Sequence, residues 1–218
     1  MNVEYERRLD EIRNALPLYE DARRLEHTMG VYRECVWFSK KFGLSEEDSY
    51  TVCASALLHD ITKNLSNAEA MEVCKRYGIT PPSASAVMHQ YTGAPFAKEV
   101  FGEDIVTEAV FSAISCHTTG KPGMSMTDKM LFVADFTEAG RKYRSCRDVR
   151  EYLHSECEKI NRNEKTALSR LLNDTVKRII GFTITYLIEK GKQIDPDMIL
   201  AWNAMVMETG SFFGKNEE

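Results

Sequence analysis

The stretch Val52-Cys53-Ala54-Ser55-Ala56-Leu57-Leu58-His59-Asp60 ends an apolar segment with an imidazole and a carboxylate side by side. A helix that is apolar on every side is normally buried. Burying a carboxylate without partners is costly, so such a group is usually paired or bound to a metal ion. The stretch therefore predicts a helix whose end carries His59 and Asp60 into the interior, where both groups need partners.

Candidate partners interrupt other apolar helical segments. His27 shares a helical face with Val31 and Cys35, and Asp135 follows the apolar run Met130-Leu131-Phe132-Val133-Ala134. A single histidine on an apolar face is more often a hydrogen-bonded core residue than a ligand. One shared metal site would explain all of these residues at once, because imidazole and carboxylate together suit iron, manganese or zinc and can converge from separate helices. The candidate ligands are His27, His59, Asp60, His89, His117 and Asp135.

Bulk composition is that of one ordinary globular domain. The chain has 218 residues and a net charge of -5, which argues against a nucleic-acid-binding protein. We find no apolar run of the roughly 18 residues that span a membrane, and the polar N-terminus predicts no secretory signal. Six cysteines without a CxxC pair indicate reduced core thiols. We therefore expect a cytoplasmic protein with neither nucleic acid nor membrane as partner.

The whole chain is expected to be helical, because no alternating strand pattern is present. Proline and glycine near Gly93-Ala94-Pro95 predict a break in one helix, and His154 is expected on the solvated surface because its segment is charged. Whether the helices at 145–159 and 162–190 are continuous stays open. The expected helices cover about residues 3–15, 18–42, 45–60, 66–77, 81–101, 103–116, 125–138, 145–159, 162–190 and 195–206.

Five blocks of sequence, in register, resemble the motifs of YqeK-type proteins, a branch of the HD-domain phosphohydrolase superfamily. His27, His59-Asp60 and Asp135 match the H…HD…D signature of that superfamily. Ala139 departs from the proline that the branch usually has between the last block and Arg141. The blocks are Arg24–Val31 (RLEHTMGV), Ala56–Lys63 (ALLHDITK), His89–Ala94 (HQYTGA), Ile114–Gly120 (ISCHTTG) and Asp128–Glu138 (DKMLFVADFTE).

The resemblance implies an all-α HD-domain helical bundle with the activity of a symmetrical bis(5'-nucleosyl)-tetraphosphatase. Such proteins split diadenosine tetraphosphate into two ADP and hold two metal ions, commonly iron. The implied HD domain spans residues 18–206. Residues 1–17 form an N-terminal helix outside the resemblance, and residues 207–218 are expected to be a disordered tail.

The resemblance also implies roles for individual residues. The six candidate ligands would hold the two metals, with Asp60 bridging them, and a metal-bound hydroxide would attack phosphorus. Asp60, Lys63 and Arg141 would act in catalysis. Asp60 would do so as the bridging ligand, and Lys63 and Arg141 would do so because cationic groups stabilise the negative charge that develops on the phosphate. The expected substrate-binding residues are Arg24, Lys63, Thr118, Thr119 and Arg141.

Two other functions remain open at this stage. A mononucleotide phosphohydrolase would use the same kind of site, because a fold does not fix its substrate. The alternative that is not an enzyme is a sensor that binds metal and nucleotide and turns over slowly. The ligand types also admit manganese, cobalt or zinc in place of iron, and a homodimer is left open.

Overall fold

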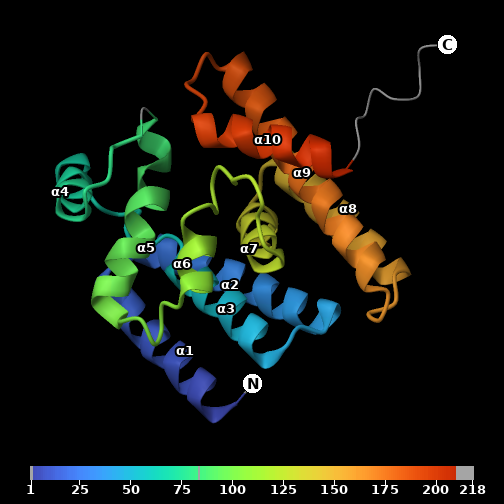
Figure 1. The fold of residues 1–218 in the computed structure, drawn as a ribbon, viewed down its shortest axis with the longest axis horizontal. Coiled ribbons are helices and arrows are strands. Elements are labelled where there is room, and N and C mark those ends of the chain that lie inside the picture. Colours follow the sequence, from blue (N-terminus) through green and yellow to red (C-terminus); the bar gives the residue numbers. More distant parts are fainter. Residues whose placement is uncertain (1, 83, 210–218) are drawn as a thin grey trace.

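The computed structural model describes residues 2–82 and 84–209, and this part of the chain is all α, with no strand. Ten α-helices and two short 3₁₀ helices follow one another (Figure 1), which confirms the predicted fold class. They are α1 (Val3–Ala15), η1 (Leu16–Leu18), α2 (Ala22–Phe42), α3 (Glu46–Leu58), α4 (Asn67–Tyr77), η2 (Ser85–Val87), α5 (Met88–Phe101), α6 (Glu108–Ile114), α7 (Met126–Thr137), α8 (Arg144–Lys159), α9 (Lys165–Glu189) and α10 (Pro196–Thr209).

Helix α3 is the centre of the fold. It packs against α1, α2, α6 and α7, and every residue from Ser49 to Leu58 is buried. The second half of α3 has no polar face in the sequence, so this part of the helix is buried on all sides. Because α3 ends at Leu58, His59 and Asp60 follow at the position where the surrounding helices meet.

Serine caps fix the starts of three helices, α3, α4 and α7. Ser66 and Ser125 form complete capping boxes with Glu69 and Asp128, and the Ser45 hydroxyl accepts a hydrogen bond from the Asp48 N–H. A capping box satisfies two backbone N–H groups that a helix start otherwise leaves without partners. These caps set the registers of α3, α4 and α7.

Helix α5 is continuous, so the predicted break near Pro95 is wrong. Pro95 lies inside the helix and removes one backbone hydrogen bond. Tight packing offsets this loss, because Ala94 and Ala97 are fully buried and a Cβ on Gly93 would lie 3.3 Å from Ile114. The helix also begins later than expected, at Met88 rather than near 81.

The other helix ends differ from the expectation by a few residues. Helix α6 begins only after Thr107, whose side chain accepts from the Val110 N–H. Helices α8 and α9 are separate, because residues 160–164 form a turn. Helix α10 runs to Thr209, three residues beyond the expected end at 206, so the expectation of a disordered tail over 207–218 is wrong for 207–209. The rest of that tail, from 210 onward, lies outside the described residues.

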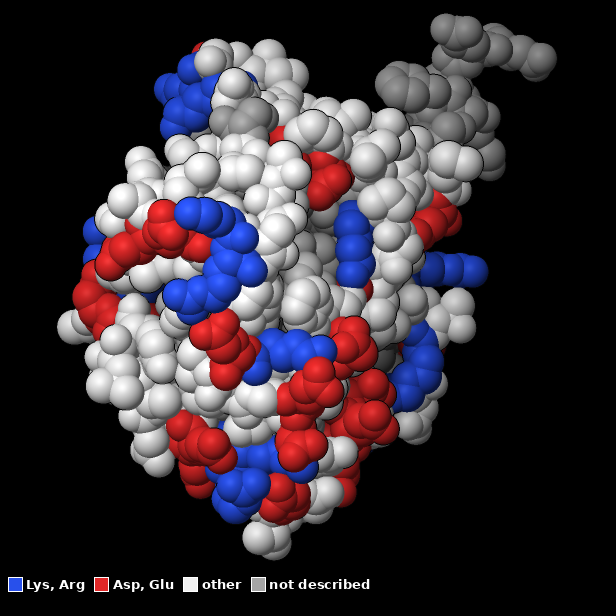
Figure 2. Space-filling model, turned by 60° about the vertical axis from the view of Figure 1, so that its left-hand side comes forward, with Lys and Arg blue, Asp and Glu red and all other residues white. Residues whose placement is uncertain are grey.

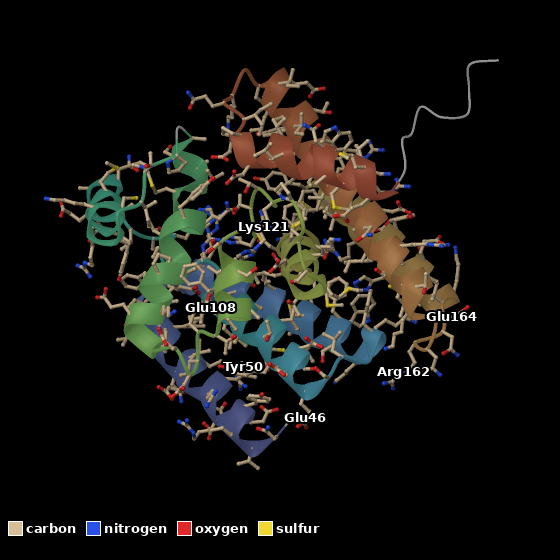
Figure 3. All side chains as sticks on the ribbon, in the orientation of Figure 1. Glu46, Tyr50, Glu108, Lys121, Arg162 and Glu164 are labelled. Carbon is tan, nitrogen blue, oxygen red and sulfur yellow. The ribbon has the colours of Figure 1, made fainter. Side chains whose placement is uncertain are left out.

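The helix at the N-terminus is part of the same core. Leu9, Ile12 and Leu16 are fully buried, and the ring of Tyr5 stacks on Tyr50 of α3 at 4.6 Å. The Tyr50 hydroxyl donates to the Ile105 carbonyl at 2.8 Å, so it joins α3 to the segment before α6 (Figure 3). Helix α1 therefore packs against α3, and its Arg13 lies over the Tyr32 ring of α2 at 5.3 Å.

His154 is not the solvated side chain that its charged segment suggested. Its ring stacks on Trp37 at 4.1 Å, and its Nε2 lies 2.7 Å from Glu34 Oε1. The neighbouring acids of α8 gave no signal of this contact, because Trp37 and Glu34 come from α2. The expectation from local composition is wrong here because a distant helix supplies the partners.

Charges of both signs are interspersed on the surface. On the face in Figure 2, Lys and Arg side chains alternate with Asp and Glu rather than gathering in one patch. Within residues 2–82 and 84–209, no helix is long and apolar enough to cross a membrane.

All six cysteines are free and buried, which agrees with the expected core thiols. Burial raises the pKa of Cys53 and Cys116 to about 12 and that of Cys157 to about 11.

Because thiolate is the reactive form, the native protein should react with a disulfide reagent at pH 8 about 100-fold more slowly than the unfolded chain. Stopped-flow thiol titration with and without guanidinium chloride measures this ratio. Any cysteine that reacts equally fast in both states would contradict the packing described here.

Candidate metal centre

Five helices bring the six predicted ligands to one point. His27 lies on α2, His59 and Asp60 follow α3, His89 lies on α5, His117 follows α6, and Asp135 lies on α7. His59, Asp60 and His117 are almost completely buried, and His89 is 6% exposed. Residues from five separate elements thus form one cluster. Two groups within it have ligand atoms mutually close enough to hold a metal ion: His27 with His59 and Asp60, and Asp60 with His89 and His117.

The carboxylate of Asp60 joins these two groups. Its Oδ2 lies 3.5 Å from His59 Nε2 and 3.7 Å from His27 Nε2. Its Oδ1 lies 3.3 Å from His89 Nε2 and 3.8 Å from His117 Nε2. One oxygen therefore faces each pair of histidines. Burial alone would raise the pKa of Asp60, but the imidazoles around it hold that pKa well below its usual range.

Asp135 completes the group around His27 and His59. Its Oδ1 lies 3.0 Å from His27 Nε2 and 3.9 Å from His59 Nε2. Burial would lower the pKa of His27, but its contacts with Asp135 and Glu138 raise it to about 9. The Nε2 atoms of His27 and His59 are 3.4 Å apart. This half of the cluster concentrates nitrogen and oxygen donors in a small volume.

Two of the histidines are oriented by the helix that each one follows. His59 Nδ1 lies 2.7 Å from the Ala56 carbonyl, and His117 Nδ1 lies 2.7 Å from the Ile114 carbonyl. A carbonyl can only accept, so Nδ1 carries a proton and donates it, and Nε2 is the ring nitrogen that faces the cluster. Metal-binding histidines are usually oriented in this way by a partner on the other ring nitrogen.

The donor set therefore fits metal ions. His117 Nε2 lies 3.1 Å from His89 Nε2, and burial lowers the pKa of His89 well below its usual value, which favours the neutral ring. Neutral imidazoles and ionised carboxylates are the forms that bind metals. A cation would satisfy these facing donors, and this mixed nitrogen and oxygen set is suited to iron, manganese or zinc.

Three cationic side chains border the cluster. Arg24 pairs with Asp60 Oδ2, and Arg141 pairs with Asp135 Oδ1 and donates through Nε to the Asp135 carbonyl at 2.9 Å. Lys63 Nζ lies 3.0 Å from His89 Nδ1, and burial lowers the pKa of this lysine. The side chains of Arg24 and Arg141 stay 27% and 33% exposed, so both can be reached from solvent.

The two threonines predicted to contact substrate have different surroundings. Thr118 is partly exposed, and its Oγ1 lies 3.1 Å from His89 Nε2. Thr119 is fully buried, and its hydroxyl is occupied by Gln90 and by the Gly120 carbonyl. The side chain of Thr118 is therefore partly accessible beside His89, whereas the contacts of Thr119 are internal.

Glu138 is a site residue that the sequence reasoning did not assign. Its Oε1 lies 3.1 Å from His27 Nδ1 and orients that ring, and its Oε2 accepts from the Gly140 N–H at 2.5 Å. A Cβ on Gly30 would collide with the Glu138 carboxylate, so Gly30 makes room for it. The signal was its position one helical turn after Asp135.

Glu20 is a second unassigned acid near the cluster. It is 5% exposed, and neither carboxylate oxygen has a hydrogen-bond partner among the described residues. Burial raises the pKa of Glu20, against smaller opposing effects of Thr28 and His59. The carboxyl group thus lies in an environment that disfavours its charge.

A comparison with protein-family models matches the HD domain to residues 24–168. The matched segment contains all six clustered ligands. The chain belongs to the HD domain family. His59-Asp60, at the end of the central helix, lies within the matched segment.

Relatives of this HD domain are similar over most of its length. A symmetrical bis(5'-nucleosyl)-tetraphosphatase of Halalkalibacterium halodurans is 28% identical over 85% of this chain and 90% of that protein. A protein of the same name from Bacillus subtilis is 25% identical over 84% and 89%. A crystal structure from Clostridium acetobutylicum, described as a predicted HD superfamily hydrolase involved in NAD metabolism, superposes with a TM-score of 0.75. The two chains are 27% identical, and the match covers 91% of this chain and 97% of the Clostridium acetobutylicum chain.

Replacing Glu20 by leucine should stabilise the metal-free protein at neutral pH. In the unfolded chain this carboxyl group ionises near its ordinary pKa of 4.5, whereas burial raises its pKa in the folded state. Wild-type stability therefore falls as pH rises above the unfolded value. We expect Glu20→Leu to raise the unfolding free energy by about 1–3 kcal/mol at pH 7, with a smaller gain at pH 5.

Urea unfolding of both proteins at the two pH values measures this gain. The exposed Glu72 serves as a control, and Glu72→Leu should change stability by less than about 0.5 kcal/mol. A Glu20→Leu protein that is less stable than wild type at pH 7 would show that the carboxylate has a favourable partner.

Proposed function

We propose that this HD domain is a metal-dependent hydrolase that splits dinucleoside tetraphosphates symmetrically into two nucleoside diphosphates. The observation that carries the proposal is Asp60, whose two oxygens face different pairs of histidines. The relatives named symmetrical bis(5'-nucleosyl)-tetraphosphatases support the choice of substrate, because the chain covers about nine tenths of their length.

The ligands divide into two sets that share Asp60. His27, His59 and Asp135 would hold one metal ion together with Asp60, and His89 and His117 would hold the other. When bound, two such ions neutralise phosphate charge and lower the pKa of water. We propose iron as the resident metal, on the resemblance to YqeK-type proteins. The donor set alone supports manganese, cobalt or zinc as well.

The protein's own cations supply binding and charge stabilisation. Arg24 and Arg141 lie on the partly exposed side of the cluster, and the planar guanidinium group suits phosphate oxygens. Lys63 is held beside His89 by the end of α3. Its ammonium group is placed to meet negative charge as a phosphate bond breaks. Thr118 adds one hydroxyl beside His89.

The product pattern tests the proposed reaction. Metal-loaded protein incubated with diadenosine tetraphosphate should yield two equivalents of ADP, resolved by anion-exchange chromatography. Formation of AMP with ATP would contradict symmetrical cleavage. Faster release of phosphate from mononucleotides than from the dinucleotide would favour a mononucleotide phosphohydrolase, and tight binding without turnover would favour a sensor.

Two substitutions separate metal binding from charge stabilisation. Asp60→Asn should abolish activity and lower the metal content, because the amide cannot supply two anionic oxygens. Lys63→Met should keep the metal content but lower kcat by about 10²–10³-fold, the usual effect of losing one group that stabilises transition-state charge. Elemental analysis and steady-state kinetics on the same preparations measure both effects. Full activity in Asp60→Asn would overturn the ligand assignment.

A further inference from the structure

The turn that follows His117 presents two backbone N–H groups beside the metal centre. Thr118 and Thr119 supply these groups, immediately after a candidate ligand. Gly120 ends the turn with a positive φ of 70°, and a Cβ there would lie 3.1 Å from Ala201 of α10. Helix α10 therefore confines the turn on one side. Backbone N–H groups in this place would suit a phosphate if no protein group occupied them.

A single buried side chain occupies both N–H groups. Gln90 Oε1 accepts from the Thr118 N–H and the Thr119 N–H, each at 2.8 Å. Gln90 Nε2 donates to Thr119 Oγ1 at 2.8 Å. The side chain is fully buried, so its amide is used entirely inside the protein. The turn thus offers substrate the Thr118 hydroxyl and not these two N–H groups.

Gln90 also lies next to a candidate ligand in the sequence. It follows His89 on α5, and the turn that it holds follows His117 after α6. The Nε2 atoms of these two histidines are 3.1 Å apart. One side chain thereby joins the two elements that carry the second pair of ligands. Among the described residues, Gln90 makes its side-chain hydrogen bonds to Thr118 and Thr119 and none to His27, His59 or Asp135 on the opposite side of Asp60.

We infer that Gln90 is a positioning residue for the second metal-binding half of the site, formed by Asp60, His89 and His117. It fixes the distance between α5 and the turn after α6 by binding two successive backbone N–H groups with one carbonyl oxygen. This role rests on the proposed two-metal hydrolase. It goes beyond that proposal because it predicts that the two metal-binding halves respond differently to one substitution.

Amide hydrogen exchange tests the contact itself in metal-free protein. Gln90→Met keeps the length and apolar stem of the side chain but removes the acceptor, so the Thr118 and Thr119 amides should exchange at least about tenfold faster. Gln90→Glu retains an acceptor oxygen and should keep both amides protected. Exchange rates read by NMR for these two amides, against amides in α3, separate a local effect from general unfolding.

Thr92→Val provides a matched control in the same helix. Thr92 is fully buried, and its hydroxyl bonds to the Met88 carbonyl and to Thr62, not to the turn. This variant should leave the Thr118 and Thr119 amides protected. Equal deprotection in Thr92→Val and Gln90→Met would mean that Gln90 contributes general stability only, and it would overturn the inference.

Metal titration tests the consequence for the site. Isothermal titration of metal-free protein with Mn²⁺ should show two binding events in wild type and in Gln90→Glu. In Gln90→Met, one event should weaken at least tenfold while the other stays within about threefold. Equal weakening of both events, or no change, would overturn the inference. The two proposals can also fail separately. If the wild type binds two ions but does not cleave dinucleotides, while Gln90→Met shows the predicted amide exchange and metal binding, the proposed function is refuted and the role of Gln90 stays intact.

Discussion

The structure depends on one buried carboxylate, that of Asp60. Burial of this charge is unfavourable by itself, so the surrounding elements must supply groups that favour the ionised form. Four imidazoles from α2, the end of α3, α5 and the end of α6 lie within 3.3–3.8 Å of its two oxygens. Each pair of histidines belongs to one oxygen. The helices therefore pack around a site that is divided in two by a single side chain.

Helix ends solve part of this problem locally. His59 and His117 each follow the last turn of a helix, and each donates from Nδ1 to the carbonyl three residues earlier, at 2.7 Å in both cases. The last carbonyls of a helix lack partners within the helix, so the imidazole satisfies one of them. The same bond directs Nε2 toward Asp60. Helix termination and ligand orientation are thus one interaction, repeated at two places.

The sequence predicts the six clustered candidate ligands better than the residues that orient them. His27, His59, Asp60, His89, His117 and Asp135 interrupt apolar segments, and all six converge as expected. Gln90 and Glu138 gave a weaker signal. An amide next to a candidate ligand, or an acid three residues after one, is common, and the partner of each lies on another element. The continuity of α5 through Pro95 and the contact of His154 with Trp37 were missed for the same reason: tertiary packing overrode local pattern.

Anomalous diffraction from crystals of the metal-loaded protein tests the central claim most directly. The account predicts two peaks, one on each side of Asp60, with His27, His59 and Asp135 nearest to one and His89 and His117 nearest to the other. A single peak bound by one oxygen of Asp60, with His89 and His117 turned away from it, would contradict the two-metal arrangement.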